Sequence, residues 1–149
     1  MSDAQIEAIW RFYSTTLDTY YYSTPYLNRA FFYAVCKQLG DTVLLGLAYH
    51  QGQPVAGTFN LQKDDIFYGR YWGSTAQIPF LHFEVCCYAP IALAIENGWQ
   101  RVEPGAGGQH KCEWLKNADH YCHVNINNYW TRGRKPVAII GRHKFYKLR

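Results

Sequence analysis

Residues 42–72 read TVLLGLAYHQGQPVAGTFNLQKDDIFYGRYW and contain three apolar runs separated by short polar segments. The runs Thr42–Tyr49, Val55–Leu61 and Ile66–Trp72 are rich in β-branched, aromatic and aliphatic residues, which favour strands. The polar segments between them are only long enough for hairpin turns. Strands joined by such short connections pair antiparallel, so the sequence predicts a three-stranded antiparallel meander.

Helical periodicity precedes these strands. Apolar residues recur at helical spacing over Asp3–Tyr21, and Ser2 with Gln5 forms a capping-box pattern at the start of this segment. We expect a second helix that begins at Thr24-Pro25, with threonine as N-cap, and ends at Gly40. Its expected apolar stripe consists of Leu27, Phe31, Ala34, Val35 and Leu39.

A third helical segment follows the strands. Helical spacing returns over Leu81–Asn97, which Gly98 terminates, and Pro90 within this segment predicts a kink or two short helices. Trp99–Glu103 and Val137–Ile140 are further predicted strands. Two helices, a meander, a helix and a strand in this order predict an α+β fold, in which one mixed, mostly antiparallel sheet carries helices on both faces.

The composition fits one globular domain, since the chain has 149 residues, of which 48% are hydrophobic and 17% aromatic. No apolar run reaches the roughly 18–20 residues that span a bilayer, and residues 1–3 lack the basic and apolar blocks of a secretory signal. The five cysteines are odd in number and two are adjacent, a pattern typical of reduced thiols. We therefore expect a cytoplasmic protein without a membrane span.

The charge is unevenly distributed along the chain. Residues 1–119 contain 8 Lys+Arg and 11 Asp+Glu, whereas residues 120–149 contain 7 Lys+Arg and no acidic residue. Such an end either contacts an anionic partner or only solvates a surface. Nucleic acid is one such partner, because aromatic and basic residues are interleaved in this region: Tyr129, Trp130, Arg132, Arg134, Lys135, Arg142, Lys144, Phe145, Tyr146 and Lys147.

Two polar clusters could carry chemistry. Arg70 and Trp72 are spaced to share one strand face, and a guanidinium there would bind a carboxylate or phosphate; the alternative is a half-buried strand with one solvated arginine. Glu84 and His82 open the third helix. Glu84 is a candidate general base if it faces a cleft, and otherwise only complements the helix dipole.

The glycine-rich segment Glu103–Lys111, EPGAGGQHK, is the most unusual stretch. Its glycines let backbone amides approach a ligand closely, and His110 and Lys111 would bring a base and donors to it. The alternative is a glycine-rich surface loop. A zinc site is a weaker interpretation, because the spacing of the available ligand types matches no standard finger or ribbon: His110, Cys112, His120, Cys122 and His123.

Three motifs, in this order and spacing, go beyond residue types: Gly69–Gly73 (GRYWG), Leu81–Cys86 (LHFEVC) and Glu103–Lys111. They resemble the predicted N-acyltransferases related to the Fem-type peptidoglycan-bridge transferases, within the GNAT superfamily. The resemblance covers roughly residues 6–111 and extends to Pro25–Leu27 in the second helix. It implies a GNAT-like acyltransferase domain over residues 1–111, with a divergent basic segment, 112–149, packed on the same domain.

The resemblance also implies an activity: an acyl or aminoacyl group moves from acyl-CoA or aminoacyl-tRNA to a small-molecule or peptide amine, with no metal. Because members of the family are longer, we expect a homodimer or a partner chain to complete the sheet. The catalytic residues implied are Glu84, His110 and His82, and the substrate-binding residues are Arg70, Trp72, Glu103, Gly105, Gly107 and Lys111. The alternative is an inactive GNAT-like binding or assembly module whose basic end contacts nucleic acid or another anionic partner.

Overall fold

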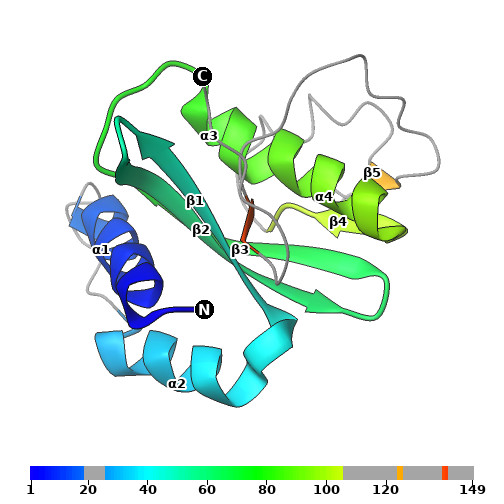
Figure 1. Ribbon diagram of the computed structural model, residues 1–149, viewed down its shortest axis with the longest axis horizontal. Helices are drawn as coiled ribbons and strands as arrows, with labels where there is room; N and C mark the ends of the chain where they lie inside the picture. The colour runs from blue at the N-terminus through cyan, green and yellow to red at the C-terminus, as the bar shows by residue number, and fades with distance from the viewer. Residues whose placement is uncertain (19–25, 106–123, 126–138, 141–149) are drawn as a thin grey trace.

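The computed structural model describes residues 1–18, 26–105, 124–125 and 139–140. Its central feature is one sheet with the strand order β5-β4-β3-β2-β1-β6 (Figure 1). The meander is antiparallel and β4 pairs parallel with β3, so the predicted mixed, mostly antiparallel sheet is confirmed. The strands are β1 (Val43–His50), β2 (Gln53–Lys63), β3 (Ile66–Ser74), β4 (Arg101–Glu103), β5 (Val124–Asn125) and β6 (Ile139–Ile140).

Helices cover both faces of this sheet, as predicted (Figure 1). We call them the α1–α2 face and the α3–α4 face. The first is covered by α1 (Asp3–Asp18) and α2 (Arg29–Leu39), which a 3₁₀ turn, η1 (Gly40–Thr42), joins to β1. The second is covered by α3 (Leu81–Phe83), the π-helical turn η2 (Glu84–Tyr88) and α4 (Ala89–Asn97).

Each face has its own apolar core, because side chains alternate between the two sides of a strand. On the α1–α2 face the buried residues include Ile9, Phe12, Phe32, Leu45, Leu47 and Phe59. On the α3–α4 face they are Ala48, Ala56, Leu81, Val85 and Ala89, continued by Leu44, Phe67, Ile91, Ala94 and Val102.

Local signals at the helix ends are confirmed. The Ser2 N–H donates to Gln5 Oε1 at 2.7 Å and the Gln5 N–H to Ser2 Oγ at 3.3 Å, which is the reciprocal geometry of a capping box. Gly40 and Gly98 follow the last residues of α2 and α4 with φ of 48° and 70°. Glycine adopts this left-handed backbone without a steric penalty, so it ends each helix.

The predicted start of α2 is wrong. The helix begins at Arg29, and Asn28 is its N-cap, with its side chain accepting the Phe31 N–H at 2.9 Å. The buried positions are Phe32 and Cys36, so the buried stripe is shifted by one residue from the predicted one. Thr24 and Pro25 lie outside the described residues, but Tyr26 and Leu27 are not helical, and the Asn28 carboxamide satisfies an N-terminal amide of the helix.

The expected interruption near Pro90 is observed, as a π turn. Proline has no N–H to donate and its ring excludes the carbonyl one helical turn before it. The chain widens immediately before the proline, where the Ala89 N–H donates to the Glu84 carbonyl five residues back. The run from Leu81 to Asn97 thus keeps one direction across α3, η2 and α4 (Figure 1).

α1 lies directly on the sheet backbone where two glycines pair. Gly57 and Gly73 are register partners in β2 and β3. A Cβ at Gly73 would overlap the Phe12 carbonyl oxygen, and one at Gly57 would lie 2.7 Å from Cδ1 of Ile9. Thr16 Oγ1 also donates to the Trp72 carbonyl at 3.0 Å. The helix is therefore closer to β3 than any side chain at position 73 would allow.

Gly73→Ala is expected to destabilise the fold by about 3 kcal/mol or more, because the added methyl meets the backbone of α1, which no rotamer change can move. Urea unfolding would measure the loss.

Gly57→Ala is a partial control, because a Cβ there would lie 2.7 Å from the end of the Ile9 side chain but also 2.9 Å from the Gly46 carbonyl oxygen. We expect Ile9→Val to restore part of the stability lost in Gly57→Ala and none of that lost in Gly73→Ala. Similar, small losses in both alanine variants would contradict this description of the contact.

Candidate functional site

Trp72 and His82 make a ring contact between β3 and the start of α3. Their ring centroids lie 5.2 Å apart with the planes at 79°, an edge-to-face arrangement. Trp72 packs on the α3–α4 face beside buried Leu81 and Val85, which hold the helix against the strand. The structure therefore brings together two residues that the sequence motifs proposed for the site.

A β-bulge interrupts β3 just before this tryptophan. Phe59 of β2 pairs with Tyr71, whereas the next residue, Asn60, pairs with Gly69. Arg70 is therefore an extra residue without a partner in the ladder. Such an insertion shifts the alternation of side chains along the strand by one position.

The bulge places Arg70 and Trp72 on opposite faces, so the prediction that they share a face is wrong. Phe67 packs on the α3–α4 face, which puts Tyr68 on the other face. The Arg70 guanidinium lies over the Tyr68 ring, 5.3 Å from its centroid, and Tyr71 packs against the α1–α2 core. The prediction assumed that side chains alternate regularly between the two faces along β3. The inserted residue breaks this alternation.

β3 and β4 part beyond a short parallel ladder. The last register pair is Tyr68 with Glu103, and the backbone of Pro104 then lies against β3, where a Cβ at Gly69 would be 3.0 Å from its carbonyl carbon and oxygen. β3 continues to Ser74, and among the described strands none pairs with this side of β3 past Tyr68.

Two of the sequence motifs lie next to β3 where it separates from β4. The turn after β4 contacts Gly69, and α3 begins beside Trp72 on the same strand. Three residues of a strand span roughly 10 Å. Gly105, the first glycine of the glycine-rich segment, has a φ of 91°, a backbone conformation that favours glycine.

Glu103 is engaged within its own strand. The Glu103 carboxylate forms an ion pair with the Arg101 guanidinium at 3.2 Å. The two side chains can meet because residues two apart on a strand share a face. The Arg101 Nε is buried and has no hydrogen-bond partner within the described residues. Arg101 therefore balances the charge of Glu103.

Glu84 lies in the π turn, half-buried. Side chains two positions apart on a helix do not face each other. Because His82 reaches Trp72, Glu84 projects toward the other flank of the helical run. The side chains of His82 and Glu84 therefore do not point toward the same site.

Several predicted site residues lie outside the described part of the chain. Gly107, His110 and Lys111 fall within residues 106–123, as do the cysteines and histidines of the zinc interpretation. The described ranges, up to residue 105 and the two short strands, contain no group of three His, Cys, Asp or Glu that would hold a metal ion.

Sequence reasoning missed a cluster of three tyrosines on the α1–α2 face. Tyr13, Tyr26 and Tyr71 come from α1, the segment before α2 and β3, and the Tyr26 hydroxyl donates to the Tyr71 hydroxyl at 3.3 Å. Burial, followed by this hydrogen bond, raises the pKa of Tyr71 to about 12, and nearby Arg70 opposes the rise. Burial also raises the pKa of Tyr13. The thirteen tyrosines of the sequence indicated aromatic packing but did not show which of them contact one another.

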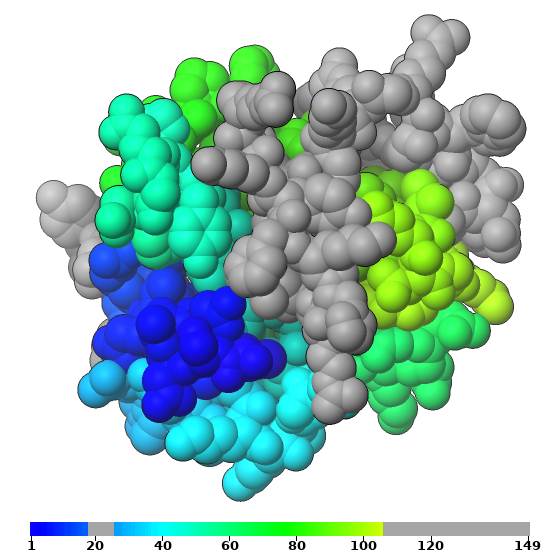
Figure 2. All heavy atoms as spheres, in the orientation of Figure 1, coloured from blue at the N-terminus to red at the C-terminus, as the bar shows by residue number. Residues whose placement is uncertain are grey.

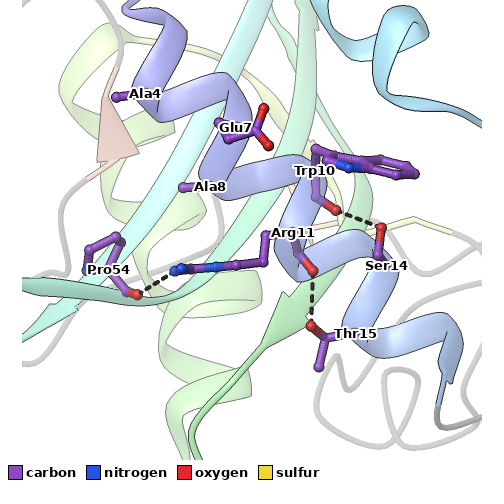
Figure 3. A pocket seen from close by; sticks show the side chains of 8 residues that line it. All are labelled: Ala4, Glu7, Ala8, Trp10, Arg11, Ser14, Thr15 and Pro54. Atoms are coloured by element: carbon purple, nitrogen blue, oxygen red, sulfur yellow. Dashed lines mark hydrogen bonds between the residues drawn. The ribbon is translucent and has the colours of Figure 1, made fainter.

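A shallow hollow of about 560 Å³ lies along the outer side of α1 (Figure 3). Arg11 extends across it and donates to the Pro54 carbonyl at 3.2 Å, whereas Trp10 points to the other side of the helix (Figure 3). No residue that the motifs proposed for the site lines this hollow. It is therefore separate from the Trp72–His82 contact.

The mixed sheet with helices on both faces is consistent with a GNAT-like α+β fold. Residues 1–130 match the FemAB-like family, described as peptidoglycan biosynthesis/recognition. The match spans most of the chain, so the chain belongs to this family, and the Fem-type resemblance is confirmed. A comparison with curated proteins and with solved structures found no match.

Among the described residues, no helix has the length and apolar character that crossing a membrane requires.

Tyr71→Phe is expected to reduce the alkaline sensitivity of the fold. The Tyr71 phenol ionises near pH 12 in the folded chain and near pH 10 when exposed, so folding favours its neutral form. Its contribution is complete below about pH 10 and is lost as the pH rises toward 12, because the unfolded chain releases this proton first. Urea unfolding at a series of pH values would measure the free energy.

The wild-type free energy of unfolding should therefore fall between pH 10 and pH 12 more steeply than that of Tyr71→Phe. At neutral pH the Tyr71→Phe variant keeps its ring in the core. Its free energy of unfolding at that pH is therefore the reference for its values at higher pH. Identical slopes for the two proteins would show that Tyr71 ionises equally easily in both states.

Proposed function

We propose that this chain is a transferase domain that moves an acyl or aminoacyl group from an activated donor to an amine, with its substrates seated where β3 and β4 part. The observation that supports this is the end of the parallel ladder at Tyr68–Glu103, beside the Trp72–His82 contact. Among the described strands none pairs with this side of β3 beyond Tyr68, and such an edge offers N–H and C=O groups to an extended ligand.

Membership of a peptidoglycan biosynthesis/recognition family supports a peptide amine as the acceptor. The donor in this proposal is acyl-CoA or aminoacyl-tRNA, both of which present an activated carbonyl carbon. No metal takes part.

The reaction in this proposal is a direct transfer. The amine nitrogen attacks the carbonyl carbon, a base accepts the amine proton, and the C–S or C–O bond to the donor breaks, which releases a thiol or a ribose hydroxyl. Backbone amides of the glycine-rich segment Gly105–Gly108 would stabilise the oxyanion that forms during attack. Glu103 and Lys111 would bind the substrates, whereas Arg70, on the opposite face of the sheet from Trp72, would take no part.

The position of His82 favours a histidine over Glu84 as the base. His82 lies against Trp72 of β3, whereas Glu84 projects to the other flank of the helical run. His110, in the glycine-rich segment, is the second candidate. A general base contributes typically about 10²–10⁴-fold to a rate.

The test is transfer to a peptide with a free amine, using a panel of acyl-CoA thioesters and a panel of aminoacyl-tRNAs as donors. We expect one panel to give turnover, and His82→Gln to lower kcat by about 100-fold or more. Release of thiol would be followed for the first panel, and transfer of a labelled amino acid for the second. A solution mass would show whether the active species is a monomer or a dimer.

Glu96→Gln, on the same helical run, is the matched carboxylate control and should keep wild-type turnover. Glu84→Gln should change kcat by less than about threefold if a histidine is the base. A large loss in Glu84→Gln with none in His82→Gln would transfer the role to the carboxylate. No turnover with either panel would overturn the proposal and favour the inactive binding module.

A further inference from the structure

Three consecutive hydroxyl side chains lie near the end of α1. The hydroxyls of Ser14 and Thr15 donate to the carbonyls four residues back in the helix, at 3.0 and 2.9 Å (Figure 3). Thr16 departs from this pattern, because its Oγ1 lies 3.3 Å from the Phe12 carbonyl oxygen but 3.0 Å from that of Trp72 in β3. A hydroxyl has one hydrogen to donate, and the nearer acceptor is the strand carbonyl. Thr16 therefore links α1 to the sheet.

This bond reaches β3 where the strand has ladder support on one side. Trp72 pairs with Thr58 of β2. Among the described strands, none pairs with the other side of β3 past Tyr68. α1 supplies a further support here, because the Phe12 backbone lies directly on Gly73, the residue after Trp72. The position of the peptide between Trp72 and Gly73 therefore depends on α1 as well as on β2.

The position of this peptide determines where the Trp72 ring lies on the opposite face of the sheet. The Trp72 ring is 5.2 Å from that of His82, and the His82 ring is also 5.5 Å from that of Phe83, with the planes at 75°. Edge-to-face contacts of this kind favour particular ring orientations. His82 is thus oriented by one ring on its own helix and by one on β3, and the second moves whenever the strand shifts.

We propose that Thr16 is a positioning residue for the candidate site. Its hydroxyl holds the Trp72 carbonyl from the α1–α2 face, and the Trp72 ring holds the His82 imidazole on the α3–α4 face. The consequence for turnover rests on the proposed function, in which His82 is a candidate base, whereas the consequence for the ring geometry does not. Misplacement of a reacting group by about 1 Å can lower a rate by about 10².

The test compares Thr16→Val, which keeps the shape of the side chain without its hydroxyl, with Thr16→Ser, which keeps the hydroxyl. The readout is the NMR resonance of the His82 Cε1–H, identified among those of the six histidines by its loss in His82→Gln. A nearby aromatic ring shifts such a resonance, so the resonance reports on the placement of Trp72. We expect Thr16→Val to move it and Thr16→Ser to leave it at the wild-type position.

The transfer assay supplies a second readout. Thr16→Val should lower kcat about tenfold and change the KM for the amine less than about twofold, because a misplaced base affects the transition state more than substrate binding. Thr16→Ser should restore the wild-type kcat. A hydroxyl that only stabilised the fold would change the free energy of unfolding and neither of these readouts.

Thr15→Val is the matched control. Thr15 precedes Thr16, its hydroxyl donates to the Arg11 carbonyl at 2.9 Å, and it lines the hollow on the outer side of α1. This variant should keep the wild-type His82 resonance and kcat.

The proposal is overturned if Thr16→Val, folded by circular dichroism, leaves the His82 resonance in place, if Thr15→Val moves it equally, or if an active Thr16→Val enzyme keeps the wild-type kcat. Should neither donor panel give turnover with the wild type, the transfer reaction is excluded and the resonance alone decides the role of Thr16. Should Thr16→Val not fold, Thr16→Ala is judged by the same criteria.

Discussion

The contact between α1 and the paired glycines Gly57 and Gly73 is the constraint on which the rest of the structure depends. It lets the helix backbone rest on the sheet, and Phe12, Ile9 and the α2 side chains then fill the space beside it. Figure 2 shows α1 and α2 as one continuous part of the surface, apart from α4 and β4. Because side chains alternate along each strand, this docking also determines which residues remain for the opposite helices.

The bulge at Arg70 separates the two faces chemically. Without it, arginine and tryptophan would point to the same side, and a single site would hold both. With the bulge, Trp72 contacts His82 of α3. Arg70 instead lies over Tyr68, on the face that α1 and α2 cover. The side chains of one five-residue motif therefore lie on two faces of the sheet, and bulges commonly redirect side chains in this way.

The sequence allowed correct prediction of features that depend on near neighbours. Short turns implied the antiparallel meander, the capping box was seen in Ser2 and Gln5, and Gly40 and Gly98 marked helix ends. Errors arose where two local signals competed, as at Thr24 and Asn28, or where a residue was inserted into a ladder, as at Arg70. For the site, the motifs named Trp72 and His82, whose rings are in contact, but not the tyrosine cluster, whose members are far apart in the chain.

By itself the sequence determined the class of fold and the family, because apolar periodicity, turn residues and motif spacing are properties of contiguous segments. Only the tertiary structure decided which face of the sheet each polar side chain occupies. The physical reason is that strand register and helix docking are settled by packing across the sheet. A single extra residue in one strand, invisible as a pattern, moves the side chains beyond it to the other face.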